Sequence, residues 1–298
     1  MSQPGWQELK VETVKDQVEA LEDWFFEQGA VAVTLEDNAD EPLLEPGVGE
    51  TPLWQNVKVV ALFVEGLDLD PIARAIPTEW LVAPVCAPVH IPDQDWERAW
   101  MDNFHPMQMG PRLWICPSWI DPPVTDAVNV MLDPGLAFGT GTHPTTAMCL
   151  GELDCAIADG ARLVDYGCGT GILAIAGLKL GAHSAIAIDN DPQAIIASHQ
   201  NAERNGIATG QLEVVMPDSE AIGQWAGSAD VVVANILAGP LAQLAPQLIA
   251  LLKPGGRLIM AGLLAEQAKD LMAIYRPHVA LEVANDLEGW VLLAGNRR

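Results

Sequence analysis

From Ala161 onwards the chain repeats one pattern, in which a short apolar run is followed by a turn and a helical segment. The apolar runs are ARLVDYG (161–167), SAIAIDN (184–190), QLEVVMP (211–217), ADVVVAN (229–235) and RLIMAG (257–262). Helical segments are expected over 171–180, 192–205, 240–252 and 265–275. This alternation predicts a parallel sheet with helices on both faces. At the end, VALEVAND (279–286) and GWVLLAG (289–295) predict an antiparallel hairpin.

The first ninety residues have a different order of elements. Strand-like segments are expected at 6–12, 30–36, 57–64 and 81–89, the last broken by prolines, with helices over 15–28 and 68–76. The resulting β-α-β-β-α-β order is typical of ferredoxin-like α+β domains. We therefore predict a small domain over 1–90, a linker helix over 91–107 and a larger α/β domain over 108–298.

The charge of the chain limits its partners. The 298 residues include 40 acidic and 15 basic ones, a net charge of -25, and residues 1–90 hold 17 acidic and 4 basic residues. Phosphate binding needs a basic face, so nucleic acid is an unfavourable partner. A basic protein or a cationic ligand suits this field better, and solubility alone is the alternative explanation.

Cysteines and apolar runs indicate the compartment. Five cysteines without a CxxC pair suggest neither a disulfide framework nor a zinc site, which favours a reducing cytoplasm. The N-terminus lacks the pattern of a signal peptide. Residues 231–252 carry no charge but include two prolines and three amide side chains, so we expect a buried strand, a loop and a helix there.

The first parallel strand ends in DYGCGTG (165–171), whose glycines let a backbone pass close under a ligand. A dinucleotide site needs a further glycine where the chain has Ile172, so hydride transfer is disfavoured. Asp189 follows Gly167 by 22 residues, at the next strand end, where a carboxylate can accept both ribose hydroxyls. Asp191 precedes a proline and is expected to cap a helix. These features fit a ribose-bearing ligand without a pyrophosphate, and S-adenosylmethionine is such a ligand.

DYGCGTG, IDND (188–191) and the terminal hairpin together resemble the class I methyltransferases. The resemblance implies a doubly wound sheet of order 3-2-1-4-5-7-6 that binds the cofactor at the carboxyl ends of its strands. It also suggests Asp218 for the adenine amino group. ANILAGP (234–240) retains Asn235 where related enzymes that methylate nitrogen begin an Asn-Pro-Pro-Tyr motif. No aromatic residue follows it, which argues against a flat base as acceptor and favours an aliphatic amine.

The stretch LDPGLAFGTGTHPTT (132–146), with VVVANILAGPL (231–241) and the acidic N-terminal domain, resembles the ribosomal protein L11 methyltransferase family over the whole chain. That resemblance implies methylation of the N-terminal amine and lysine side chains of L11, a basic ribosomal protein that the small domain recognises. It also implies that Thr146, Gly167, Asp189 and Asn235 contact S-adenosylmethionine and that Asn235 is catalytic.

The expected mechanism is mostly positioning, because in-line methyl transfer aligns a neutral amine with the methyl carbon and the sulfur. No residue is assigned as the base. His143 lies in the loop, but a histidine before a proline is more often a structural hydrogen-bonding group. Three alternatives stay open: a dinucleotide-dependent oxidoreductase, a nucleic-acid methyltransferase and a non-catalytic adaptor.

Overall fold

The computed structural model describes residues 5–39, 52–91, 104–133 and 143–298, and the chain divides into two compact units, Met1–Asp102 and Asn103–Arg298. Most of the predicted linker helix, 92–103, lies outside the described residues. The two ends of that linker are not helical, because Ile91 closes strand β4 and Met107 opens strand β5. A paired strand of each unit therefore lies at each end of the predicted linker.

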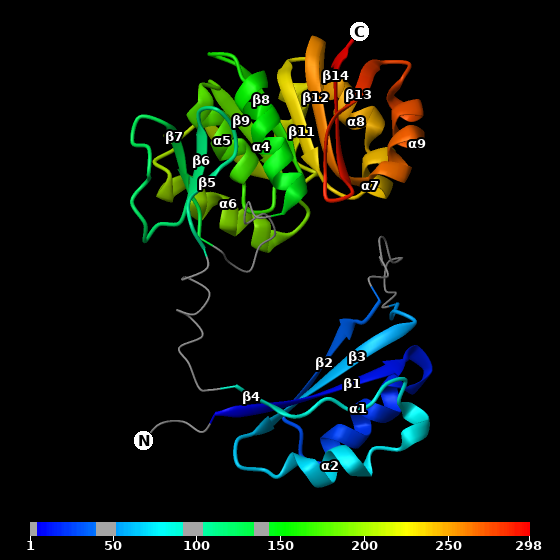
Figure 1. Ribbon diagram of the computed structural model, residues 1–298. Helices are drawn as coiled ribbons and strands as arrows, with labels where there is room; N and C mark the ends of the chain where they lie inside the picture. The colour runs from blue at the N-terminus through cyan, green and yellow to red at the C-terminus, as the bar shows by residue number, and fades with distance from the viewer. Residues whose placement is uncertain (1–4, 40–51, 92–103, 134–142) are drawn as a thin grey trace. The chain divides into compact units, whose positions relative to one another are not determined.

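The N-terminal unit is a four-stranded antiparallel sheet with two helices (Figure 1). Its elements are β1 (Trp6–Val14), η1 (Lys15–Gln17), α1 (Val18–Glu27), β2 (Ala32–Asp37), β3 (Asn56–Val64), α2 (Leu69–Ala75), η2 (Thr78–Trp80) and β4 (Val89–Ile91). The strand order is β2-β3-β1-β4. The strand expected over 81–89 is wrong in extent, because only Val89–Ile91 pairs with β1. Pro84 and Pro88 lack the N–H that ladder pairing requires.

The C-terminal unit is built on a seven-stranded sheet of order β10-β9-β8-β11-β12-β14-β13 (Figure 1). These strands are β8 (Arg162–Tyr166), β9 (Ser184–Ile188), β10 (Leu212–Val215), β11 (Ala229–Asn235), β12 (Leu252–Leu264), β13 (Val279–Leu287) and β14 (Trp290–Arg297). Strands β8 to β12 are parallel, and β14 is antiparallel to both β12 and β13. The turn between β13 and β14 is Glu288–Gly289, whose φ values of 53° and 82° are those of a tight hairpin. The predicted parallel sheet and terminal hairpin are confirmed.

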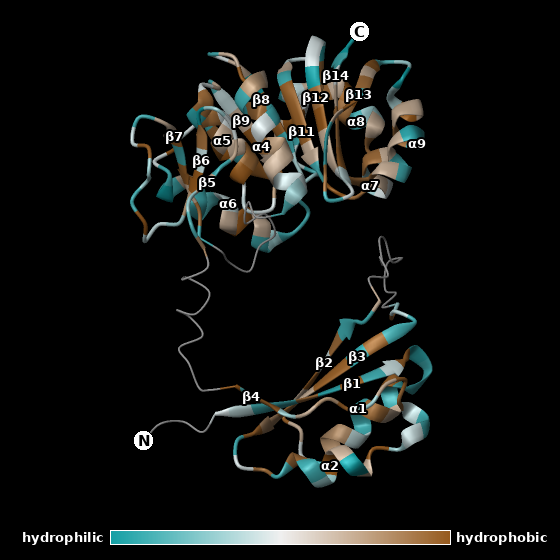
Figure 2. Cartoon of the chain, in the orientation of Figure 1, coloured by the Kyte–Doolittle hydropathy of each residue, from teal (hydrophilic) through white to brown (hydrophobic). Residues whose placement is uncertain are grey.

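Helices cover both faces of this sheet. One apolar core includes residues of α4 (Pro144–Ala156), α5 (Ile172–Leu180) and α6 (Pro192–Arg204), and the other includes residues of η4 (Glu220–Trp225), α7 (Ala238–Gln243), α8 (Ala245–Leu251) and α9 (Ala265–Tyr275). A single helix was expected over 240–252, but two short helices meet at Leu244. Pro246 lies in the first turn of α8 and has no N–H to continue the ladder of α7. Figure 2 shows apolar residues concentrated along the central strands.

A three-stranded sheet, β5-β6-β7, precedes α4. Its strands are β5 (Met107–Gln108), β6 (Leu113–Cys116) and β7 (Val128–Met131), and β6 and β7 pair in parallel. Leu113, Ile115 and Val130 are fully buried in the same core as α4 and α5. None of the helices in the described parts of the chain has the length and apolar character needed to cross a membrane.

Candidate functional site

A tight turn joins β8 to α5 and carries the glycines of DYGCGTG. Gly167 has a φ of 78°, and Gly171, the N-cap of α5, has a φ of 74°, so both lie in the left-handed region that favours glycine. A Cβ atom at Gly167 would lie 2.3 Å from Cγ2 of Ile236, on the loop after β11. The strand-to-helix turn expected from the glycines is therefore confirmed, and it packs closely against the end of β11.

Asp189 lies just after β9 and is half-buried. Its Oδ2 accepts a hydrogen bond from the backbone N–H of Gly169 at 2.8 Å, and its Oδ1 accepts one from the N–H of Asp191 at 3.0 Å. The carboxylate is thus held against the Gly-rich turn, with acceptor capacity left on each oxygen. Asp191 accepts from the N–H of Gln193 at 2.8 Å, so its predicted role as the cap of α6 is confirmed.

Asn235 and Thr146 lie 89 residues apart in the chain and meet in the structure. Asn235 is the last residue of β11, and Thr146 lies buried in the first turn of α4. The Nδ2 of Asn235 donates a hydrogen bond to Oγ1 of Thr146 at 3.2 Å. Because Ile236 packs against Gly167, three of the four predicted cofactor contacts lie around the end of β11.

His143 and Trp290 lie beside this contact. His143 is the N-cap of α4: its Nδ1 accepts from the N–H of Thr145 and lies 2.7 Å from Oγ1 of the same residue. The ring of Trp290 meets the His143 ring edge to face, with 5.0 Å between centroids. In the sequence, an aromatic residue was expected only in the segment directly after Asn235, so Trp290 was missed. The available signal was the terminal hairpin, whose second strand begins at the carboxyl end of the sheet.

Asp165 was also missed, although it opens the Gly-rich motif. Its side chain is fully buried, and its Oδ2 accepts a hydrogen bond from the N–H of Ala174 in α5 at 3.0 Å. Its Oδ1 has no hydrogen-bond partner among the residues that the structure describes. Burial raises the pKa of this carboxyl group to about 7, and the negative charge of Asp189 adds to the shift. A buried acceptor without a partner suits a cationic ligand.

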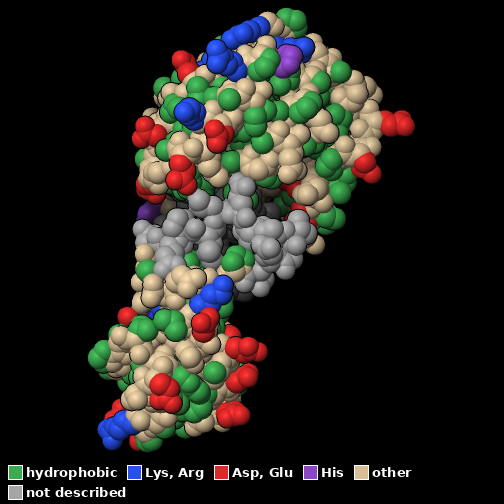
Figure 3. Space-filling view, turned by 90° about the vertical axis from the view of Figure 1, so that its right-hand side faces the viewer, with side chains coloured by type: hydrophobic (Ala, Val, Ile, Leu, Met, Phe, Trp, Pro, Cys, Tyr) green, Lys and Arg blue, Asp and Glu red, His purple; other side chains and the backbone are tan. Residues whose placement is uncertain are grey.

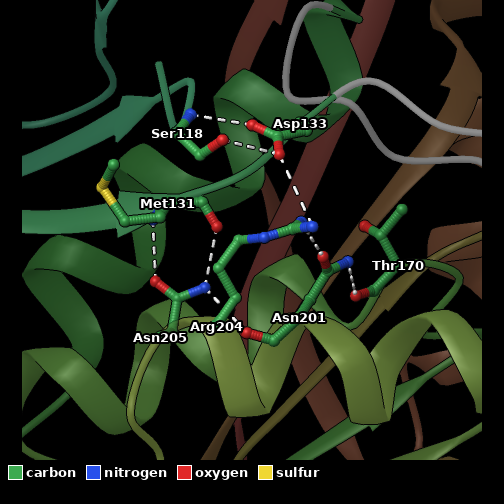
Figure 4. Close-up of polar contacts among 7 residues, drawn as sticks. All are labelled: Ser118, Met131, Asp133, Thr170, Asn201, Arg204 and Asn205. Carbon is green, nitrogen blue, oxygen red and sulfur yellow. Dashed lines mark hydrogen bonds and ion pairs between the residues drawn. The ribbon is translucent and has the colours of Figure 1, made fainter. Parts of the chain in front are cut away.

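Helix α6 connects the Gly-rich turn to the segment that begins the Gly/Thr loop (Figure 4). Asn201 donates from Nδ2 to the carbonyl oxygen of Thr170 at 2.9 Å and accepts from Arg204 at 3.0 Å. Arg204 in turn pairs with Asp133 at 3.5 Å. Asp133 accepts from the N–H and the hydroxyl group of Ser118 at 2.7 and 2.9 Å. Side chains of one helix therefore connect both segments, and no local sequence signal marks this connection.

Asn205, the residue that caps the C-terminus of α6, pairs with β7. Asn205 accepts from the N–H of Met131 at 2.7 Å and donates to the carbonyl oxygen of Met131 at 2.8 Å (Figure 4). An amide side chain thus replaces a strand partner at the end of β7, two residues before Asp133. This pairing fixes where the chain leaves the three-stranded sheet.

Asp218 lies exposed on the turn after β10, so its role toward an adenine group stays a prediction. Residues 134–142 of the Gly/Thr loop lie outside the described residues. Within the four described ranges no cluster of His, Cys, Asp and Glu is arranged to hold a metal ion.

Positive charge gathers at the end of the sheet away from the Gly-rich turn. Arg162 begins β8, Lys253 and Arg257 lie near the start of β12, and Arg297 ends the antiparallel β14, so all four mark the amino end of the parallel strands. Figure 3 shows Lys and Arg side chains grouped at one end of the C-terminal unit. Asp165 and Asp189 lie at the opposite end of the strands, where the field favours a cation.

The buried carboxyl group of Asp165 predicts a pH dependence of stability. Its pKa is raised to about 7 in the folded protein, against roughly 3.9 for an unfolded aspartate. The folded state binds more protons between these values, so this group lowers the free energy of unfolding as pH rises from about 4 to about 7, by on the order of 4 kcal/mol. We expect the free energy of unfolding of Asp165→Asn, measured by denaturant titration at pH 5 and at pH 8, to lack this decrease with pH.

The exposed Asp286 of β13 provides the control for that experiment. Asp286→Asn should retain the pH dependence of the natural protein. An equal slope in Asp165→Asn and the natural protein would show that the Asp165 carboxyl group does not carry the effect.

Comparison with known proteins shows the family of the chain. The family model "Ribosomal protein L11 methyltransferase (PrmA)" matches residues 5–298. A ribosomal protein L11 methyltransferase of Actinobacillus pleuropneumoniae serotype 3 is 50% identical over 296 residues, which cover 99% of this chain and 100% of that protein. One of Vibrio cholerae serotype O1 is 53% identical over 258 residues, 86% of each chain.

A solved structure extends the comparison to the fold. The crystal structure of a ribosomal protein L11 methylase from Lactobacillus delbrueckii subsp. bulgaricus has a TM-score of 0.58 and 32% identity, and the match covers 65% of this chain and all of that one. The described sheet is thus the α/β fold of a methyltransferase. A family match over nearly the whole length and identities near 50% lead to one conclusion: the chain belongs to the ribosomal protein L11 methyltransferase family.

Proposed function

We propose that this protein transfers methyl groups from S-adenosylmethionine to the N-terminal amine and lysine side chains of ribosomal protein L11. The observation that carries the proposal is the hydrogen bond of 3.2 Å between Asn235 and Thr146, next to the Gly-rich turn. It joins two of the sequence segments on which the resemblance to the family rests, 132–146 and 231–241. The names of the relatives supply the substrate.

The residues at the carboxyl end of the sheet fit this cofactor. Bound S-adenosylmethionine supplies a methyl group on a positively charged sulfur. The Oδ1 of Asp165 is a buried acceptor that lacks a partner among the described residues, and Asp189 retains acceptor capacity at the next strand end. We assign Asp189 to the ribose hydroxyls, Gly167 to close backbone contact, Thr146 and Asn235 to the reacting end, and Asp218 to the adenine amino group.

The acceptor amine must lose its proton before it attacks the methyl carbon. At pH 7 a lysine with a pKa of about 10.4 costs roughly 4.6 kcal/mol to deprotonate, and an α-amine about 1 kcal/mol. Desolvation lowers both values. Asn235 donates from Nδ2 to Thr146, which orients its Oδ1 as the acceptor for the neutral amine. We assign His143 to capping α4, because its Nδ1 accepts a hydrogen bond from the backbone N–H of Thr145.

We infer a division of labour between the two units. The order of β8 to β14 is that of class I methyltransferases, 3-2-1-4-5-7-6, and the antiparallel order β2-β3-β1-β4 is that of ferredoxin-like domains. Residues 1–90 then recognise the basic protein substrate, 91–107 connect the units, and 108–298 bind the cofactor and catalyse transfer. The excess of acidic over basic residues in 1–90 supports docking of a basic protein. We place the reaction in the cytoplasm, without a nucleic-acid or membrane partner.

Asn235→Ala tests both the proposal and the residue. Incubation of the natural protein with labelled S-adenosylmethionine and a ribosomal protein mixture should label L11. The variant should lose on the order of 100-fold in turnover at saturating cofactor, because one positioned polar group at the reacting end is removed. Gln200→Ala, which removes an exposed amide from α6, should leave turnover unchanged. A normal single-turnover rate in Asn235→Ala excludes the catalytic role.

A further inference from the structure

A groove lies on the C-terminal unit between α4, β13 and the loop that joins β5 to β6. It has a volume of about 370 Å³, and its lining includes Met109, Ala147, Gly151, Ala284 and Leu287. The loop is held in place by Asp154 of α4, which accepts from the backbone N–H and the guanidinium of Arg112 at 2.8 Å each. Two walls of the groove, α4 and this loop, are therefore fixed relative to one another.

The register of the terminal hairpin decides which side chains face this groove. Glu282 pairs with Ala294 and Leu287 with Trp290, and both partners belong to the core on the α4 side. Asp286 pairs with Val291, which belongs to the core on the opposite face. An irregularity between Val283 and Asn285 shifts the alternation along the strand. Glu282 thus lies on the groove side of β13, and Asp286 lies on the other side.

The elements that form the groove carry acidic residues, and Glu152 is the one in its lining. Residues 143–156 and 279–289 contain five acidic residues and no lysine or arginine. Two of these carboxylates are paired, Glu152 with Arg257 at 2.6 Å and Asp154 with Arg112 at 2.8 Å. The other three, Glu282, Asp286 and Glu288, form no ion pair with a described residue and are exposed to solvent. Of these three, Glu282 is the one that the register places on the groove side, and its unpaired carboxylate favours a positively charged group there.

One end of the groove lies near the proposed site. Ala147 directly follows Thr146 on α4, and Leu287 pairs with Trp290, whose ring contacts His143. Strand β13 is the last strand of the sheet order, so its outer edge can pair with an extended chain. A polypeptide that leaves this edge at the carboxyl end of the parallel strands would cross the ends of β14 and β12 to reach Asn235 at the end of β11.

We propose that this groove, the α4–β13 groove, binds the extended, basic segment of the protein substrate that carries the amine to be methylated. The inference rests on the proposed function and specifies where the C-terminal unit holds its substrate. Glu282 is the residue that selects a basic chain, and the apolar wall formed by Ala147, Ala284 and Leu287 accepts the aliphatic part of its side chains.

Two charge reversals on one strand test the proposal. Glu282→Lys and Asp286→Lys change the charge equally, but only the first lies on the groove side. With L11 as substrate, we expect Glu282→Lys to raise KM at least 10-fold and to leave kcat nearly unchanged. Asp286→Lys should change KM less than 3-fold. Both variants should bind S-adenosylmethionine like the natural protein. The effect of Glu282→Lys should shrink at 0.5 M salt, where the Debye length is about 4 Å.

A second variant separates packing from charge. Ala284→Leu fills part of the groove on an exposed edge strand and should also raise KM for L11, while a short peptide with a free α-amine should react at the natural rate. If the natural protein does not methylate L11, the proposed function is wrong. If the natural protein methylates L11 but KM for L11 is unchanged in Glu282→Lys and Ala284→Leu, the groove proposal alone is wrong. It is also wrong if Asp286→Lys raises this KM as much as Glu282→Lys does. If the natural protein sediments as a dimer and the two groove variants sediment as monomers, the groove binds a second copy of the chain, and the proposal is overturned.

Discussion

A chain that begins at Pro92 is expected to bind S-adenosylmethionine with the affinity of the full-length protein and to lose nearly all methylation of intact L11. All five residues assigned to the cofactor belong to the C-terminal unit, whose two cores contain only residues from that unit. The N-terminal unit has its own core, which includes Leu9, Phe25 and Phe63. Its removal should therefore leave the cofactor site folded. Loss of a second attachment point lowers effective concentration, so a decrease of about 10²- to 10⁴-fold in kcat/KM is expected.

Calorimetry with the cofactor and a labelled-methyl assay with L11 measure the two parts of this expectation. The full-length protein assayed at 1 M salt serves as the control, because the Debye length there is about 3 Å and docking through the acidic N-terminal unit should weaken in the same direction. If the shortened chain methylates intact L11 as fast as the full-length protein, the recognition role of residues 1–90 is wrong.

Gly167→Ala is expected to weaken cofactor binding on the order of 100-fold. At a φ of 78° a side chain in place of glycine costs roughly 1–2 kcal/mol. The added Cβ would also lie 2.3 Å from Cγ2 of Ile236, and overpacking of this kind costs about 1–3 kcal/mol. Since the Gly169 N–H is bonded to Asp189, a shift of the turn also displaces the carboxylate assigned to the ribose.

A second substitution separates the two causes. Ile236→Ala removes the atom that the new Cβ would meet, so Gly167→Ala/Ile236→Ala should recover the part of the affinity lost to the clash and keep the part lost to backbone strain. Gly223→Ala is the matched control, because its Cβ would meet no atom within 4 Å and its φ is not positive. Calorimetric affinities that are equal in Gly167→Ala and the natural protein would refute the close approach at this turn.

Local features of the site could be predicted from the sequence because their physical causes are local. A left-handed turn needs glycine at Gly167 and Gly171 whatever surrounds it, and Asp191 before Pro192 caps α6 through its own backbone neighbours. The alternation of apolar runs and helical periodicity likewise predicted the sheet and hairpin of the C-terminal unit. The prediction was wrong in extent at β4, where a strand expected over nine residues pairs over only three, because prolines cannot donate a backbone hydrogen bond.

Tertiary structure alone decided which distant residues meet. Sequence periodicity places Asn235 at a strand end and Thr146 near a helix start, but their hydrogen bond depends on how α4 packs on β11. The contact between Trp290 and His143 depends in the same way on the antiparallel return of β14. The raised pKa of Asp165 requires that helices on both faces exclude water from the strand end, because desolvation by the whole fold causes the shift and no neighbour in the sequence can supply it.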